Sequence, residues 1–200
     1  MTSDLYAFDA DYKLKYGAVC GVDEAGRGPL CGPVCVAAVI LDESTKINGI
    51  NDSKKLSEKK REALYDEIIK NAVSYQIVFV EPQIIDEINI LRATMLGMKN
   101  AVEGLSFVPS LALIDGNRCP DTDIPTQYVI KGDAFSASIA AASILAKVTR
   151  DRYMINLAQE YPQYQLEKHK GYPTKLHYEL LDKYGIQSFY RKSFLKNRGY

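Results

Sequence analysis

Hydrophobic and polar residues are grouped along the chain in blocks that predict a mixture of strands and helices. Short apolar runs rich in Val, Ile and Ala, bounded by Gly, Pro or Asp, are typical of buried strands. Longer segments with apolar residues three and four apart indicate amphipathic helices. The predicted strands are 18–23, 34–41, 75–80, 111–115 and 127–131, and the predicted helices are 57–70, 84–89, 92–103, 134–159 and 175–183.

The order of these elements predicts the fold class. Strands come first, strands then alternate with helices, and only helices and a basic tail are expected after residue 131. This order is typical of an α/β protein whose central sheet is flanked by helices, with a helical extension at the C-terminus. We expect the long helix 134–159 to join two parts, residues 1–150 and residues 151–200.

Charge is balanced over the whole chain but not along it. The 25 Lys and Arg residues equal the 25 Asp and Glu residues, so the net charge indicates no partner. Residues 147–200 nevertheless carry eleven basic and five acidic side chains. A basic C-terminal quarter favours a surface that faces phosphate, although a solvated helical surface gives the same pattern.

The N-terminus and the apolar runs indicate where the protein works. Residues 1–11 are polar and acidic, unlike a signal peptide, and the longest apolar run, 34–41, is too short to span a bilayer. We therefore expect a cytoplasmic protein with reduced thiols and no membrane contact, and nothing requires it to be more than a monomer. Cys31 and Cys35 have no second pair or histidine cluster beside them, so buried structural thiols are expected.

Acidic residues follow predicted strands at three points. Asp23 and Glu24 come directly after a buried strand, Asp115 ends another, and Asp133 leads into the long helix. Ligands bind at the strand ends of open α/β sheets, so these carboxylates are expected to converge. Divalent cations such as Mg²⁺ or Mn²⁺ would relieve their mutual repulsion, and a two-metal site suits displacement at phosphorus. Taken singly, Asp115 also fits a turn and Asp133 a helix N-cap.

Six short motifs occur in order between about residue 18 and residue 175. They are Asp-Glu-Ala-Gly-Arg-Gly-Pro-Leu (23–30), Asn-Asp-Ser-Lys-Lys-Leu-Ser (51–57), Ile-Asp-Gly-Asn (114–117), Lys-Gly-Asp (131–133), Ala-Ala-Ser-Ile-Leu-Ala-Lys-Val-Thr-Arg-Asp (141–151) and His-Lys-Gly-Tyr-Pro-Thr (169–174). With these motifs the chain closely resembles the type 2 ribonuclease H family, in particular bacterial ribonuclease HII. The resemblance implies a ribonuclease H-like fold with a mixed central sheet. It also implies a catalytic domain over residues 1–150 and a helical substrate-binding extension over residues 151–200.

The resemblance implies that the site residues of the family correspond to individual positions in this chain. It implies that the catalytic and metal-binding residues are Asp23, Glu24, Asp115 and Asp133. Only the 2′-hydroxyl distinguishes RNA from DNA at one nucleotide, and glycines let backbone groups approach that sugar closely. The substrate-binding residues that the resemblance and the residue chemistry together indicate are Gly26, Arg27, Gly28, Ser53, Lys54, Lys55, Ser143, Lys147, Arg150, His169 and Tyr172.

Several of these positions also have a simpler interpretation. Ser143 and Lys147 are four residues apart and share one face of the long helix, which fits phosphate contacts or a solvated face. Tyr172 offers a flat ring to a sugar, but tyrosines also serve in ordinary packing. His169 could contact nucleic acid or protonate a leaving group, whereas His177 is expected to be structural.

The implied activity is metal-dependent endonucleolytic cleavage of the RNA strand of RNA–DNA hybrids. It includes nicking on the 5′ side of single ribonucleotides in duplex DNA, which leaves 5′-phosphate and 3′-hydroxyl ends and serves ribonucleotide removal and primer removal. The alternatives are a ribonuclease HIII-like nuclease, a non-catalytic hybrid-binding module and a phosphatase of small esters. The tail 187–194 resembles a sliding-clamp peptide only faintly, and a docked or nucleic-acid-facing tail is expected instead.

Overall fold

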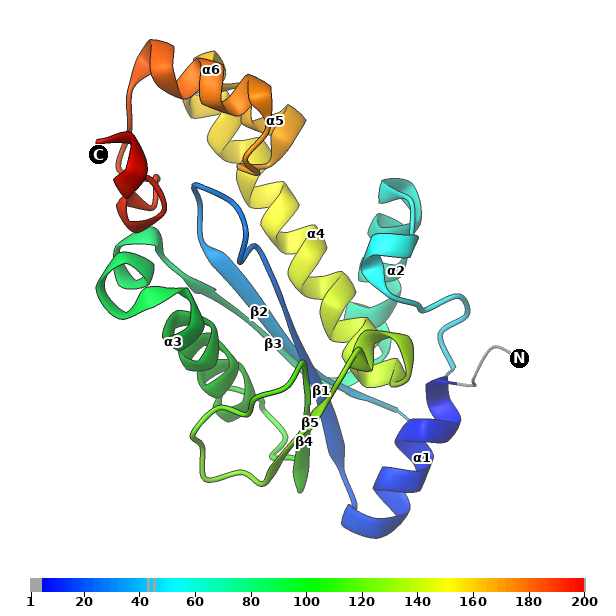
Figure 1. Ribbon diagram of the computed structural model, residues 1–200. Helices are drawn as coiled ribbons and strands as arrows, with labels where there is room; N and C mark the ends of the chain where they lie inside the picture. The colour runs from blue at the N-terminus through cyan, green and yellow to red at the C-terminus, as the bar shows by residue number, and fades with distance from the viewer. Residues whose placement is uncertain (1–4, 43, 45, 200) are drawn as a thin grey trace.

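The described residues form a mixed five-stranded sheet. The computed structural model describes residues 5–42, 44 and 46–199 (Figure 1). The sheet consists of β1 (Val19–Ala25), β2 (Val34–Leu41), β3 (Ala72–Val80), β4 (Leu111–Asp115) and β5 (Thr126–Val129), in the order β3-β2-β1-β4-β5. β1 to β3 form an antiparallel meander, whereas β4 and β5 run parallel to β1. The predicted mixed sheet is therefore confirmed.

Helices cover both faces of this sheet, as Figure 1 shows. The α4 helix (Ala137–Glu160) crosses one face, together with α1 (Leu5–Tyr16) and α2 (Glu58–Asn71), and α3 (Pro82–Glu103) covers the other. All eight residues of β2 are buried, because alternate side chains pack beneath α4 and beneath α3. A continuous apolar strand sequence is the expected result of burial on both faces.

The α4 helix lies unusually close to β1. A Cβ atom placed on Gly21 in the middle of β1 would stand 2.1 Å from the carbonyl carbon of Ser138, so no larger residue fits there. This close approach brings the first turns of α4 against the strand that carries Asp23. One glycine therefore fixes the spacing between the sheet and the helix on which the candidate site depends.

The C-terminal part packs around its own hydrophobic cluster. After α4 come the 3₁₀ turn Pro162–Tyr164, α5 (Leu166–His169), α6 (Lys175–Tyr184) and two 3₁₀ turns, Lys192–Phe194 and Lys196–Arg198. Their apolar side chains surround Tyr164 and reach Cys31 in the loop after β1. The α4 helix runs without a break past residue 151, so the same helix belongs to both the sheet region and this cluster.

Most predicted elements are confirmed with small shifts in their ends. Ser57 caps α2 as expected, with Oγ accepting from the backbone N–H of Lys60. The two predicted helices 84–89 and 92–103 are the halves of α3, which is kinked at Asn89 with φ 68°. The strand predicted to end at residue 23 continues to Ala25, and the helix predicted from residue 134 begins at Ala137 after the Ser136 cap. The helix α1 was not predicted.

Cys31 and Cys35 are buried and not disulfide-bonded, which confirms structural thiols at these positions. Among the described residues, no helix is both long enough and apolar enough to cross a membrane.

Candidate active site

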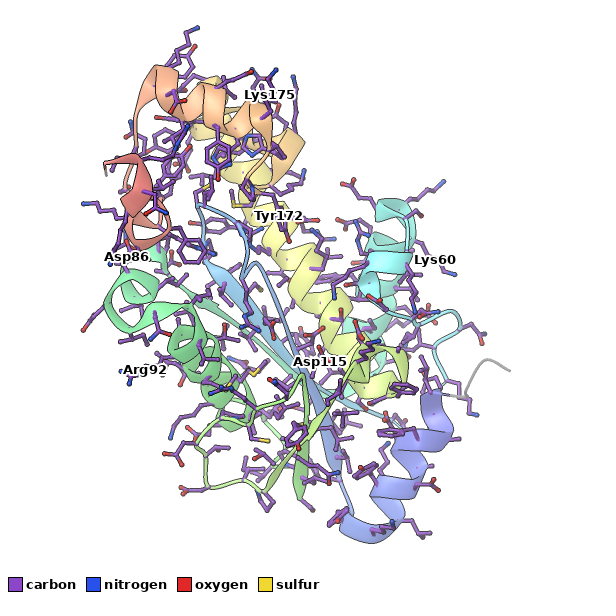
Figure 2. The ribbon with its side chains drawn as sticks, in the orientation of Figure 1. Lys60, Asp86, Arg92, Asp115, Tyr172 and Lys175 are labelled. Atoms are coloured by element: carbon purple, nitrogen blue, oxygen red, sulfur yellow. The ribbon has the colours of Figure 1, made fainter. Side chains whose placement is uncertain are left out.

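The four predicted carboxylates lie at the carboxyl ends of three parallel strands. Asp23 and Glu24 lie near the end of β1, Asp115 ends the neighbouring β4, and Asp133 follows β5 in the 3₁₀ turn Gly132–Ala134. Figure 2 shows Asp115 at the end of its strand, near the N-terminal part of α4. The structure therefore places these residues at one edge of the sheet, as the sequence predicts.

Asp23 and Glu24 point to opposite faces of the sheet. Asp23 pairs with Ala37, whose side chain belongs to the cluster beneath α4, and Glu24 pairs with Val36, which packs beneath α3. Asp115 shares the α4 face with Asp23, because it lies two residues beyond Leu113 on β4. This alternation explains how adjacent acids can be tolerated, while Asp23 and Asp115 still lie on one face of neighbouring strands.

Burial and mutual repulsion raise the pKa of every one of these carboxyl groups. Desolvation is the largest cause in all four, and it raises the pKa of Asp23 well above the usual range. The charges of Glu24 and Asp115 raise the pKa of Asp23 further, and Asp115 does the same to Asp133. Raised pKa values at clustered carboxyl groups identify a site at which negative charge is costly until a cation arrives.

Hydrogen bonds hold the individual carboxylates in place. Asp23 accepts the backbone N–H of Glu24 at 2.7 Å, and Asp115 accepts that of Gly132 at 2.6 Å. The second bond ties the end of β4 to the turn that carries Asp133. Asp133 is thereby set beside Asp115 although the two residues belong to different elements.

Two cationic side chains approach the cluster from outside. Lys54 Nζ lies 3.6 Å from Asp133 Oδ2, and Arg27 Nη1 lies 3.5 Å from Glu24 Oε1. Both cations are substantially exposed, and the Lys54 side chain is 78% exposed. Exposed cations beside a carboxylate cluster can move to a phosphate when a substrate arrives.

Asp52 is an acidic neighbour that the sequence-based site residues did not include. Its Oδ1 accepts the backbone N–H of Lys54 at 2.9 Å, and its charge contributes to the raised pKa of Asp115 and Asp133. The signal in the sequence was its place in the motif 51–57.

The predicted Gly-Arg-Gly loop lies against Tyr172. Gly26 has φ +97°, and a Cβ atom there would lie 2.0 Å from Arg150 Nε, so only glycine fits. A Cβ atom on Gly28 would instead lie 3.9 Å from Tyr172 Cε1, in ordinary contact. The ring of Tyr172 is 38% exposed, and Lys147 Nζ lies 5.7 Å from its centre. The loop, the ring and Lys147 thus form one rim, and the loop directly follows Asp23 and Glu24.

Arg150 and His169 are buried, so they are not placed for the substrate contacts that the sequence predicts. Arg150 is 1% exposed, and its guanidinium donates to the backbone carbonyls of Pro33, Lys170 and Cys31. His169 is buried, with Nε2 donating to Tyr164 O and Nδ1 accepting from Gly171 N–H. Burial lowers the pKa of His169, so the neutral ring is favoured and a proton-donating role is not supported.

The two predicted serines are also turned inward. Ser53 and Ser143 are each 3% exposed, and their hydroxyl groups are 2.7 Å apart. Ser143 also hydrogen-bonds Asp23, which lowers the otherwise raised pKa of that carboxyl group. The serines therefore connect the lysine-bearing loop to α4 and to Asp23, and they are not placed for direct phosphate contact. Lys55, by contrast, is exposed in the same loop.

The donor set fits hard divalent cations. All four side chains offer carboxylate oxygens, which select ions such as Mg²⁺ or Mn²⁺ over softer metals. Among the described residues, no three His, Cys, Asp or Glu side chains are already arranged as a metal cage. Mg²⁺ is usually bound through one or two carboxylates together with substrate phosphate, so an open cluster agrees with this chemistry.

Comparison with known proteins gives the family. The family model described as Ribonuclease HII matches residues 20–197. The chain belongs to the ribonuclease HII family. A curated ribonuclease HII from Caldicellulosiruptor bescii is 52% identical over 200 residues, covering 98% of this chain and 97% of the relative. The protein is therefore a ribonuclease H, a nuclease of the hydrolase class, and the alternative of a non-catalytic module is wrong.

Solved structures show the same fold. Ribonuclease H2 from Pyrococcus horikoshii OT3 superposes with a TM-score of 0.75 at 29% identity, covering 91% of this chain and 96% of that one. Ribonuclease HII from Archaeoglobus fulgidus, in its complex with PCNA, gives a TM-score of 0.73 at 28% identity over 87% and 93% of the two chains. The expected ribonuclease H-like fold is confirmed.

Proposed function

We propose that this family member is a divalent-metal-dependent endonuclease that nicks duplex DNA on the 5′ side of single embedded ribonucleotides. We propose further that it cleaves the RNA strand of RNA–DNA hybrids, leaving 5′-phosphate and 3′-hydroxyl ends. Through this activity it would begin ribonucleotide removal from DNA and help to remove primer RNA. The observation that carries the proposal is the position of the Gly26–Gly28 loop, which directly follows Asp23 and Glu24 and lies against Tyr172.

The carboxylates would hold the metal ions. Asp23, Glu24, Asp115 and Asp133 offer oxygen ligands whose raised pKa values reflect the cost of uncompensated negative charge. The chemistry that Mg²⁺ or Mn²⁺ supplies when bound is activation of the attacking water and stabilisation of the leaving 3′-oxygen. Asp23 and Asp115, on one face of the sheet, keep their orientation through backbone N–H donors.

The rim would select the ribonucleotide. Gly28 has no side chain, so the sugar can approach the loop backbone, where the 2′-hydroxyl is the one group that marks RNA. The ring of Tyr172 offers a flat surface across the loop from that sugar. Lys54 and Lys55 lie in an exposed position from which they can bind the phosphates on either side of the cut.

We also propose that residues 151–200 form the substrate-binding extension and that the enzyme acts as a cytoplasmic monomer. Residues 151–200 hold nine basic residues, and all but Arg191 are at least partly exposed, which supports binding of a polyanion. The relative from Archaeoglobus fulgidus was solved with PCNA, but here Phe189 and Tyr190 are buried against Tyr164. These two aromatic side chains are occupied by the protein itself, which favours the docked tail over a clamp-binding peptide.

A cleavage assay tests the proposed function. The substrate is a DNA duplex with one ribonucleotide, incubated with Mg²⁺, Mn²⁺ or EDTA, beside an all-DNA duplex and a long hybrid. We expect a metal-dependent nick 5′ of the ribonucleotide and no cut in the all-DNA control. Cleavage of the long hybrid alone would contradict the role proposed for Gly26–Gly28 and Tyr172 at an RNA–DNA junction. A ribonuclease HIII-like preference would then describe the enzyme better.

A further inference from the structure

Arg191 is a fully buried cation that reaches from the C-terminal tail into the Gly-Arg-Gly loop. Its side chain is 0% exposed. Nη2 donates to Gly26 O at 2.7 Å, Nη1 donates to Arg27 O at 3.1 Å and to Pro29 O at 2.8 Å, and Nε donates to Gly32 O at 2.9 Å. One guanidinium therefore holds four carbonyl groups of a single loop.

Arg150 completes the arrangement from the α4 side. It donates to Cys31 O and Pro33 O, so the two arginines together hold six carbonyl groups between residues 26 and 33. Neither guanidinium forms an ion pair with a carboxylate of a described residue. Desolvation and the charge of Arg150 lower the pKa of Arg191 to about 9. Burying two such cations together is costly unless their hydrogen bonds are satisfied, and the loop carbonyls satisfy them.

The orientation of the carbonyl groups determines where the amide groups of the loop point. In a trans peptide the C=O of one residue and the N–H of the next are antiparallel. Gly26 O and Arg27 O point at Arg191, so the N–H groups of Arg27 and Gly28 point away from it. Gly28 lies against Tyr172, at the rim where the sugar is proposed to bind.

The tail is also attached by contacts that do not involve the guanidinium. Phe189 and Tyr190 are already buried in the C-terminal hydrophobic cluster, and Tyr190 forms a β-bridge with Cys31. The backbone of Arg191 is fixed as well, because its N–H donates to Leu30 O at 2.9 Å. The four side-chain bonds are therefore additional to these attachments, and all four end on carbonyl groups of the loop.

We propose that Arg191 is a positioning residue for ribose selection, which holds the loop so that the N–H groups of Arg27 and Gly28 face the ribonucleotide. The proposal rests on the proposed function, in which this loop reads the 2′-hydroxyl. Arg191 itself does not touch the substrate. It acts through the loop backbone, and Arg150 supports the same loop from the other side.

The test compares Arg191→Gln with a matched control in the same tail. Arg198→Gln removes an arginine that binds the Asp182 carboxylate and lies outside the loop contacts. For each variant, kcat and KM are measured on the single-ribonucleotide duplex, Kd on an all-DNA duplex, and the thermal midpoint by circular dichroism. For Arg191→Gln we expect kcat/KM to fall by roughly tenfold or more, with the all-DNA Kd within about twofold of the parent. For Arg198→Gln we expect kcat/KM and the all-DNA Kd either to change together or to stay as in the parent.

A purely structural role gives a different pattern. If Arg191→Gln kept its kcat/KM while folded, or lost DNA affinity and activity in parallel, the positioning role would be overturned. Arg191→Lys, which keeps the charge but not the forked donors, is expected to restore only part of the activity. If the parent enzyme did not cleave the single-ribonucleotide duplex, that result would contradict the proposed function itself, on which this inference rests.

A measurement on the unchanged protein covers the case in which the variants do not fold. In ¹⁵N-resolved NMR spectra of the parent protein with EDTA, the Arg27 and Gly28 amide signals are expected to shift more with the ribonucleotide duplex than with the all-DNA duplex. Equal shifts with both duplexes would contradict the orientation of these N–H groups on which the role of Arg191 depends.

Discussion

Gly28 lies directly opposite the ring of Tyr172, and a Cβ atom on Gly28 would stand 3.9 Å from Tyr172 Cε1. That distance is an ordinary van der Waals contact, so the fold itself does not require glycine at this position. Under the proposed function the requirement comes from the substrate, because a methyl group there would occupy the space through which a sugar approaches the loop. Glycine at position 28 is therefore not required for folding, whereas the proposed recognition of the ribonucleotide requires it.

The Gly28→Ala variant is therefore expected to fold normally and to lose activity. Replacing a glycine by alanine in an unstrained position costs nothing or stabilises slightly, by about 0.4–1 kcal/mol. Cleavage at a single ribonucleotide should fall roughly 100-fold, because a misplaced sugar moves the phosphate away from the carboxylates. Thermal melting and kcat/KM on the same preparations check both statements. Parent-like cleavage by this variant would show that the sugar does not pass between the loop and Tyr172.

Asp23→Asn is expected to abolish cleavage while hybrid binding is largely kept. The variant should also melt a few degrees above the parent in EDTA at pH 7 to 8, because it removes a buried charge. The sign follows from the raised pKa of Asp23. At neutral pH the folded state must ionise a group that it disfavours, and this cost disappears once the pH falls below the unfolded pKa. The gain should therefore shrink on acidification.

Metal titration provides the control for that interpretation. Adding Mg²⁺ or Mn²⁺ should raise the melting temperature of the parent, since a ligand that binds only the folded state stabilises it. The same addition should have little effect on Asp23→Asn. Equal stabilisation of both proteins would show that the metal binds without Asp23. Near-full activity of Asp23→Asn would show that this carboxylate is not a catalytic metal ligand.

Lys54→Ala is expected to weaken substrate binding without weakening the fold. The pair between Lys54 and Asp133 is exposed on the lysine side, and such pairs contribute little to stability. If Lys54 binds a phosphate, the slope of log Kd against log salt concentration should decrease by about one in the variant. Lys15→Ala, at the exposed end of α1 before the start of β1, is the matched control. An unchanged slope for Lys54→Ala would show that this lysine stays with the carboxylates.

The sequence predicts the sheet and the carboxylates well because both depend on local patterns. The apolar run of β2 is buried on two faces, and its bounds coincide with the predicted ones. Asp115 and Asp133 follow strands that turn out to be parallel neighbours, so their convergence is a consequence of topology. The helix α1 was missed because its sequence carries no continuous apolar stripe. It is held by contacts such as that of Asp9 with the N–H and hydroxyl of Ser138.

The sequence cannot separate exposed from buried cations. Lys147 and Arg150 lie three residues apart on α4, and both fitted a phosphate-binding face. In the structure the side chain of Arg150 points into the interior, where it donates to loop carbonyls that are distant in sequence. Arg191 was passed over for the same reason, since nothing near it in the sequence shows that its partners lie about 160 residues earlier. Long-range hydrogen bonds of this kind decide the role of a basic residue.

His177 gives the last prediction, which concerns acid stability. Its Nδ1 donates to Tyr172 O at 2.9 Å, and its Nε2 accepts from the Tyr190 hydroxyl at 3.0 Å. The ring stacks on His169 at 4.1 Å and lies near Cys31. Burial, and then the charge of His169, lower the pKa of His177 to about 4. The neutral ring is therefore part of the folded state.

A lowered histidine pKa gives stability that is present above the unfolded pKa and lost as the pH falls. As the pH falls from about 6.5 to about 4, the contribution of His177 should lower the free energy of unfolding by roughly 3 kcal/mol. The carboxyl groups with raised pKa values act in the opposite direction, so the parent alone does not isolate this effect. The difference in unfolding free energy between the parent and His177→Gln, measured by urea denaturation in EDTA from pH 8 to pH 4, does isolate it. That difference should decrease steadily below pH 6.5, and a constant difference across this range would show that His177 already titrates normally in the folded protein.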